Sequence, residues 1–122
     1  MCAYQRVDGE PCCAHTRYEQ QILRDEWGFN GLITSDCGAI NDFLPRYHNV
    51  VETPQQAVAI GVRAGTDVEC GSLYRYLPEA VKNGWVSEEA RERIMACSVQ
   101  NLRSYVDGDP VNVVNRPREA RS

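Results

Sequence analysis

Two acidic residues, Asp36 and Glu69, are the residues of this sequence best suited to chemistry. Each is followed by a Cys-Gly pair, with Cys37 and Cys70 as the cysteines. Each also ends a short run of β-forming residues, so each is predicted to lie at the end of a buried strand. α/β folds place ligands and reactive groups at the carboxyl ends of their strands. Asp36 could equally cap the following helix, since Asp is a favoured N-cap residue.

A metal centre is one chemistry that paired carboxylates can support. Asp36 and Glu69 would then hold a divalent metal in a barrel enzyme, but two carboxylates are too few ligands to make this convincing. Six cysteines are many for 122 residues, yet neither a Cys-x-x-Cys pair nor closely spaced histidines occur. His15 and His48 stand alone, which favours surface or capping roles. The sequence predicts no metal and no cofactor.

The cysteines do not indicate a small protein held together by disulfides. Such proteins carry their cysteines in loops. Here the cysteines lie within the strand and helix patterns, so a disulfide framework is not expected, and the redox compartment stays undecided.

Strand and helix patterns alternate along the chain. Strands are expected at residues 1–5, 31–36 and 66–70, helices at 16–27, 53–64, 78–82 and 87–105, short helical turns at 40–43 and 72–76, and a loop at 6–11. Helix signals support this division. Thr16 with Glu19 predicts a capping box, Gly28 ends that helix, and Thr53 followed by Pro54 begins the next.

Alternation of strands and helices indicates βαβ units and a parallel sheet. The carboxyl ends of parallel strands lie at one edge of the sheet, and consecutive strands are commonly neighbours. We therefore expect Asp36, Glu69, Cys37 and Cys70 to come together at one place.

Length and composition indicate one small globular domain. The chain has 122 residues, 43% of them hydrophobic and 25% charged. A net charge of −4 gives no support to a nucleic-acid partner. No stretch approaches the length of a membrane span, and no leader is visible. Met1 opens directly into a strand pattern, which suggests a fragment or a reading frame begun at an internal methionine.

Five stretches of the sequence resemble glycoside hydrolase family 3, the β-glucosidase and β-xylosidase family. In order along the chain, they are residues 1–11, 22–31, 35–37, 64–71 and 79–84. The resemblance covers about the first hundred residues. It implies an α/β fold that is part of the family's N-terminal (β/α)8 barrel of the TIM type, with about three β/α units and parallel strands. Residues 1–106 would form this part, and residues 107–122 a polar, loosely ordered tail.

The resemblance also implies a reaction and a nucleophile. Members of the family hydrolyse terminal, non-reducing β-linked sugars with retention of configuration, and Asp36 falls on the catalytic nucleophile. Such enzymes need a second carboxyl group about 5–5.5 Å away as acid and base. Tyr4 falls on a tyrosine close to the nucleophile, where it could bind that carboxylate or the sugar. The alternative for Tyr4 is a structural, buried tyrosine.

With Cys37 after Asp36, the sequence resembles the β-xylosidase-like branch of the family, because many β-glucosidases of the family have Trp at this position. A disulfide between Cys37 and Cys70 is sterically plausible and would crowd the space that the C6 hydroxymethyl group of a hexose needs. Two buried free thiols are the alternative. Glu69 would bind a sugar hydroxyl, or less plausibly act as a makeshift acid/base.

The partners that the resemblance implies are an oligosaccharide or β-glycoside substrate and further parts of an enzyme. A later domain normally supplies the acid/base, so we expect the isolated chain to be inactive or nearly so. The alternative is an inactive α/β module that only binds saccharide or a partner chain. Parent enzymes of this family are often exported, which makes a periplasmic or extracellular location the expectation for a parent.

Overall fold

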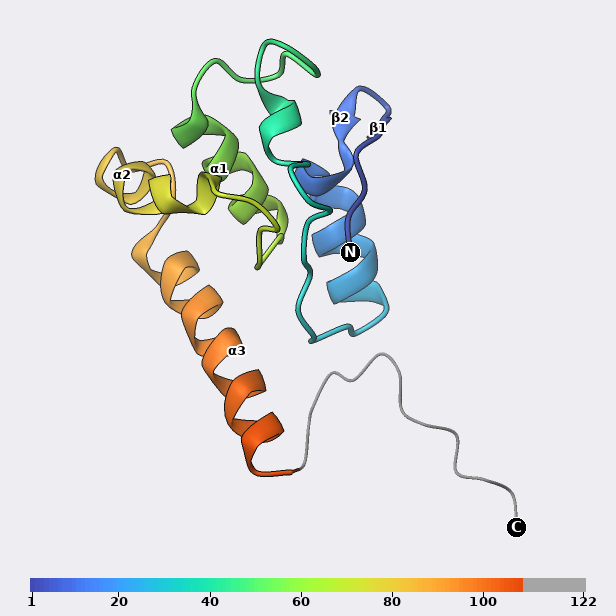
Figure 1. Ribbon diagram of the computed structural model, residues 1–122. Coiled ribbons are helices and arrows are strands. Elements are labelled where there is room, and N and C mark those ends of the chain that lie inside the picture. Colours follow the sequence, from blue (N-terminus) through green and yellow to red (C-terminus); the bar gives the residue numbers. More distant parts are fainter. Residues whose placement is uncertain (109–122) are drawn as a thin grey trace.

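The computed structural model describes residues 1–108, except the side chains at positions 97, 98 and 101. In chain order, its elements are β1 (Arg6–Val7), β2 (Glu10–Pro11), 3-10 helix η1 (Cys12–Ala14), π-helix η2 (Arg17–Glu26), 3-10 helix η3 (Asn41–Phe43), α1 (Pro54–Ala64), 3-10 helix η4 (Leu73–Tyr76), α2 (Leu77–Lys82) and α3 (Glu88–Val106) (Figure 1). Within the described residues, every helix is too short or too polar to cross a membrane.

Three segments run parallel through the centre of the molecule, in the order that the sequence predicts. Parallel bridges join Cys2 to Ser35 and Thr34 to Val68, so the middle segment lies between the first and the third. The amide of Cys2 donates to the carbonyl of Thr34 at 2.9 Å, and the amide of Ser35 donates to the carbonyl of Val68 at 2.8 Å. The three full strands expected here are wrong in extent, because each segment forms isolated bridges. We call these three segments the parallel ladder.

The strands of the described residues form a hairpin, in a region that the sequence predicts as a loop. β1 and β2 pair antiparallel, with Arg6 opposite Pro11. Between them Asp8 and Gly9 adopt positive φ angles of 50° and 88°, which suits the tight turn of a two-residue hairpin. The predicted loop therefore contains a tight turn, and the strands on each side were missed because two residues are too few to be recognised from alternation.

The first long helix forms where expected, but as a π-helix and with a different start. The amide of Trp27 donates to the carbonyl of Ile22 at 3.0 Å, which is the wide turn of this helix type. The predicted capping box is wrong, because Thr16 has helical dihedral angles and its side chain caps nothing. Glu19 is instead buried inside the molecule. Gly28 ends the helix with φ +68°, as predicted.

The later helices confirm their sequence signals. The hydroxyl of Thr53 accepts from the amide of Gln56, whose side chain accepts from the amide of Thr53, so the two form a full capping box at α1. Ser87 caps α3 by accepting from the amide of Ala90 at 3.1 Å. The predicted tail begins at residue 107, and its residues 109–122 lie outside the described part.

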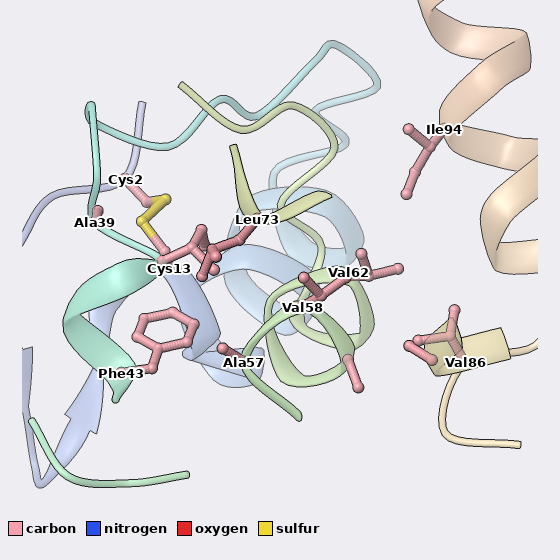
Figure 2. Packing of buried hydrophobic residues seen from close by; sticks show 13 residues of the cluster. Cys2, Cys13, Ala39, Phe43, Ala57, Val58, Val62, Leu73, Val86 and Ile94 are labelled. Carbon is pink, nitrogen blue, oxygen red and sulfur yellow. A yellow bond between two sulfur atoms is a disulfide. The ribbon is translucent and has the colours of Figure 1, made fainter. Parts of the chain in front are cut away.

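The hydrophobic core surrounds α1 (Figure 2). Buried aliphatic groups of α1 meet Phe43 of η3 and Leu73 of η4. α3 joins this core near its start, where Ile94 is buried near Val86, while the remainder of the helix projects away from the body (Figures 1 and 2). The core therefore packs α1 against the connections that leave the carboxyl end of the parallel ladder.

A buried ion pair closes the amino end of the parallel ladder. Asp67 Oδ2 accepts from Arg24 Nη2 at 2.6 Å and from the amide of Ile33 at 2.9 Å. Arg24 also donates to the carbonyl of Gly65 at 3.1 Å. Asp67 is 3% exposed. The pair joins the π-helix to two segments of the ladder, and no local sequence pattern indicates it.

A second buried acid lies beside this ion pair. The hydroxyl oxygen of Thr66 is 2.9 Å from Glu19 Oε2 and 3.0 Å from the carbonyl oxygen of Cys13. One hydroxyl hydrogen cannot satisfy both acceptors, whereas a protonated Glu19 supplies a second hydrogen. Burial raises the pKa of Glu19 to about 7, against the opposing effects of Thr66 and Arg24. The carboxyl group is thus held in an environment that favours its neutral form.

Two disulfides cross-link the described residues. Cys2 is bonded to Cys13, which ties the start of the parallel ladder to η1 (Figure 2). The second bond joins Cys37 to Cys70. The expectation that the cysteines form no disulfide framework is therefore wrong, because residues separated by 11 and by 33 positions meet through the fold.

Candidate functional site

Asp36 lies at the carboxyl end of the middle segment of the parallel ladder. Its amide donates to the carbonyl of Cys2 at 2.9 Å, which holds its backbone in the ladder. Its carboxylate is partly buried, and Oδ1 accepts from the amide of Cys37 at 2.8 Å. Asp36 does not cap the next helix, because η3 begins after Ile40. The carboxylate therefore stands at the edge of the ladder with one backbone donor.

Tyr4 reaches the same edge from the first segment of the ladder. Its hydroxyl donates to the carbonyl of Cys37 at 2.6 Å. The side chain is 44% exposed, so the alternative of a buried structural tyrosine is wrong. Partial burial and then the carboxylate of Asp36 raise the pKa of Tyr4, with a smaller contribution from Asp42. The phenol consequently remains a hydrogen-bond donor next to Asp36.

A disulfide between Cys37 and Cys70 connects the ends of the middle and third segments. This confirms the predicted bond and removes the alternative of two free thiols. Backbone contacts reinforce it, since the amide of Gly38 donates to the carbonyl of Cys70 at 2.7 Å. The amide of Cys70 in turn donates to Ser35 Oγ at 3.0 Å. The residue after Asp36 is thus fixed on both its main chain and its side chain.

Glu69 has a different environment from Asp36. Its Oε1 accepts from the amide of Leu73 at 2.9 Å and its Oε2 from the amide of Tyr74 at 2.6 Å. The carboxylate therefore caps the start of η4. A catalytic acid or base must hold or take a proton, which would compete with these two hydrogen bonds. Binding of a sugar hydroxyl by Glu69 stays a prediction.

The contacts that His48 and Arg6 make beside Tyr4 are not predicted by the sequence. His48 Nε2 lies 2.7 Å from the carbonyl oxygen of Tyr4, and Arg6 donates to the carbonyl of His48 at 3.3 Å. More than 40 positions separate His48 from both partners, so no local spacing could have indicated these contacts. The sequence indicates only a long connection over residues 37–51, which brings His48 back to the first segment of the ladder.

The geometry supports nucleophilic chemistry by a carboxylate. Asp36 is accessible in part, accepts from a backbone amide, and lies near a phenolic donor. Among residues 1–108, no group of three or more side chains is placed to hold a metal ion. Nucleophilic attack at a sugar also needs an acid/base partner, and Glu69 is engaged elsewhere.

Comparison with known proteins gives a consistent family. The family model described as "Glycosyl hydrolase family 3 N terminal domain" matches residues 1–101. A xylan 1,4-beta-xylosidase of Xylanibacter ruminicola is 55% identical over 91 residues, which are 73% of this chain and 10% of that protein. A probable beta-D-xylosidase of Arabidopsis thaliana is 40% identical over 113 residues, which are 90% of this chain and 14% of that protein.

The fold is shared with solved enzymes of the same family. A family 3 exo-beta-xylosidase, solved with a xylobiose aziridine probe, superimposes with a TM-score of 0.75 at 33% identity. The match covers 89% of this chain and 15% of the exo-beta-xylosidase. This likeness fits an α/β fold of the kind found in the N-terminal domains of these enzymes. The chain spans about a tenth to a seventh of the length of the relatives it matches.

Proposed function

The chain belongs to glycosyl hydrolase family 3, and from this membership we propose that it carries the nucleophile of a retaining β-glycosidase. Asp36 has this role. The observation that carries the proposal is the position of its carboxylate at the end of the parallel ladder, 2.8 Å from the amide of Cys37 and near the hydroxyl of Tyr4.

The proposed reaction has two steps. Asp36 attacks the anomeric carbon of a β-linked sugar, the bond to the leaving group breaks, and a glycosyl ester forms on its carboxylate. Water then attacks the ester and releases the sugar with its original configuration. A second carboxyl group, about 5–5.5 Å from the first, protonates the leaving group and then activates the water. Tyr4, as a neutral phenol, donates a hydrogen bond to Asp36 or to the sugar.

The acid/base of this reaction comes from outside the 122 residues. Glu69 binds the backbone of η4 through both oxygens, which argues against a proton-transfer role. Its proposed task is to hold η4 against the site and to accept from a sugar hydroxyl through a remaining lone pair. Partners that complete the site are further barrel segments and a later domain.

The preferred substrates are β-xylosides. The disulfide between Cys37 and Cys70 fills space directly beside the nucleophile. A xylosyl ring has a hydrogen where glucose carries its C6 hydroxymethyl group, so the disulfide discriminates against the larger sugar. The names of the relatives from Xylanibacter ruminicola and Arabidopsis thaliana support this direction.

Residues 1–106 correspond, in this proposal, to about three β/α units of a (β/α)8 barrel, with residues 107–122 as a tail. Three parallel segments cannot close a barrel, because closure requires every strand to pair on both sides. The isolated chain therefore has little or no turnover, and its unpaired edges favour association.

A second candidate function is a non-catalytic α/β module that binds saccharide or a partner chain. The engagement of Glu69 with backbone amides favours it, because this acid cannot easily complete the catalytic pair. Saccharide binding, or stable assembly with a partner, without any reaction at Asp36 would distinguish this function.

Labelling with a 2-deoxy-2-fluoro-β-xylosyl fluoride tests the proposal on the purified chain. Fluoride leaves without protonation, and the 2-fluoro group slows hydrolysis, so the reagent reports on the nucleophile without requiring the acid/base. The expected result is one fluoroxylosyl adduct in the intact mass and a slower reaction with the glucosyl reagent. A chain that unfolds cooperatively yet takes no adduct would favour the second candidate function.

A further inference from the structure

His48 contacts the backbone beside the proposed nucleophile. Its Nε2 lies 2.7 Å from the carbonyl oxygen of Tyr4, which is 44 positions away in the sequence. A carbonyl oxygen only accepts hydrogen bonds, so Nε2 must carry the hydrogen of this contact. The side chain is partly buried. The contact therefore assigns both a partner and a donor atom to this histidine.

The backbone of His48 is itself anchored. Its amide donates to the carbonyl of Asp42 at 2.7 Å, just after the start of η3. Its carbonyl accepts from Arg6 Nη1 at 3.3 Å, and Arg6 Nε donates to the carbonyl of Gly9 at 2.9 Å in the hairpin turn. The imidazole is consequently presented to Tyr4 from a backbone held by two separate parts of the chain.

Tyr4 is held at two points. His48 donates to its carbonyl oxygen, while its own hydroxyl donates to the carbonyl of Cys37 at 2.6 Å. The amide of Cys37 then donates to Oδ1 of Asp36 at 2.8 Å. These contacts form a continuous path from the imidazole to the carboxylate, and each link restricts the orientation of the next group.

We propose that His48 is a positioning residue for the nucleophile and that it acts through Tyr4. By fixing the main chain of Tyr4, it directs the phenol onto the peptide that holds the carboxylate of Asp36. The effect on reaction rate rests on the proposed function, whereas the effect on the geometry of Asp36 does not. A misplacement of about 1 Å near reacting atoms can cost about 10²-fold in rate.

Two substitutions separate the hydrogen bond from the bulk of the ring. His48→Gln places an amide NH₂ where Nε2 lies and keeps a donor, whereas His48→Leu keeps volume and removes the donor. Tyr47→Leu serves as a control, because Tyr47 is the adjacent residue and is 60% exposed. Thermal unfolding of all four chains shows whether any variant is globally destabilised.

NMR tests the geometric part on the full chain, independently of activity. We expect a ring Nε2–H proton of His48 that is protected from exchange with water. We also expect the carboxyl carbon signal of Asp36 to move in His48→Leu and to stay in place in His48→Gln and Tyr47→Leu. An unprotected ring proton, or an Asp36 signal that is the same in all chains, would overturn the proposal.

Fluoroxylosyl labelling tests the catalytic part. His48→Leu is expected to lower the limiting rate of adduct formation about tenfold with little change in the concentration that half-saturates it, and His48→Gln to retain most of the rate. Equal losses in both variants that follow their melting temperatures would indicate a structural role and overturn the assignment. A wild-type chain that takes no label would contradict the proposed function instead, and the Asp36 carbon signal would then decide on positioning.

Discussion

The two ends of the parallel ladder both carry carboxylates, in opposite environments. At the amino end, Asp67 and Glu19 are 3% and 4% exposed, and Asp67 is paired with Arg24. At the carboxyl end, Asp36 is partly buried and has a backbone amide and a phenol as neighbours. A paired, buried carboxylate stabilises a fold, whereas an accessible carboxylate without a cationic partner can attack a substrate.

This difference agrees with the general division of labour in α/β barrels. Their carboxyl-terminal face carries chemistry, and their amino-terminal face carries stability. The disulfide of Cys37 and Cys70 lies beside Asp36, while that of Cys2 and Cys13 joins the ladder to η1. Substitutions at the two ends should therefore affect different measurements.

Replacing Asp36 should give the largest effect, and on reactivity alone. Asp36→Asn removes the proposed nucleophile, so fluoroxylosyl labelling should fall by about 10³-fold or more. Its free energy of unfolding should change by less than about 1 kcal/mol, because one amide hydrogen bond is affected. Labelling kinetics and urea unfolding measure the two quantities. A labelling rate equal to that of the wild type would remove Asp36 from the reaction.

Replacing Asp67 should give the opposite pattern. Asp67→Asn leaves the charge of Arg24 without its partner in a largely buried place, at a cost of about 3 kcal/mol in the free energy of unfolding. Urea unfolding measures the loss. Arg91→Ala, which removes an exposed ion pair with Glu88, is the matched control and should cost less than about 1 kcal/mol. Equal losses in the two variants would contradict a structural role for the buried pair.

Glu19 should make stability depend on pH. Its pKa is raised from 4.5 to about 7 in the fold, so the folded state binds a proton that the unfolded state releases above pH 4.5. The resulting stabilisation is complete below about pH 4.5 and is lost as pH rises to about 7, by about 3 kcal/mol in total. Urea unfolding across this range measures it.

The neutral variant Glu19→Gln isolates this contribution, because its side chain does not titrate. The stability of the wild type relative to Glu19→Gln should fall between pH 4.5 and pH 7. Glu26→Gln, at an exposed position of the same helix, should show no comparable fall. A constant difference between wild type and Glu19→Gln would mean that the fold leaves the pKa of Glu19 unchanged.

Removing the hydroxyl of Tyr4 should have the smallest effect. Tyr4→Phe loses the hydrogen bond to the carbonyl of Cys37, so labelling at Asp36 should slow about tenfold, equivalent to about 1.4 kcal/mol. Stability should change little, because the side chain is 44% exposed. Labelling kinetics and urea unfolding measure the two effects. A large loss of stability at an unchanged labelling rate would mean that Tyr4 has a structural role and does not assist Asp36.

Local signals predict most of the helices and the order of the ladder. Thr53 and Ser87 begin α1 and α3 because their hydroxyls cap free amides. Alternation of strand and helix patterns predicts parallel neighbours, and the bridges at Ser35 and Val68 confirm the order. That order also made a bond between Cys37 and Cys70 sterically plausible, since both cysteines follow an acid at a strand end, and the structure contains this bond.

Contacts between distant segments could not be predicted in the same way. Thr16 and Glu19 have the spacing of a capping box. The side chain of Glu19 is instead buried against Thr66, and the side chain of Thr16 caps no amide. Cys2 meets Cys13 only because the ladder and η1 pack together. The hairpin rests on strands of two residues, which are too short for a periodic pattern.

Mapping the label to a residue is the most direct test of the central claim. The purified chain is treated with the fluoroxylosyl reagent and digested, and the labelled peptide is sequenced by mass spectrometry. A single label on Asp36, absent from Asp36→Asn, is the result predicted for a nucleophile at the carboxyl end of the ladder. A label on Glu69 or Asp67, or none on a folded chain, would contradict that assignment.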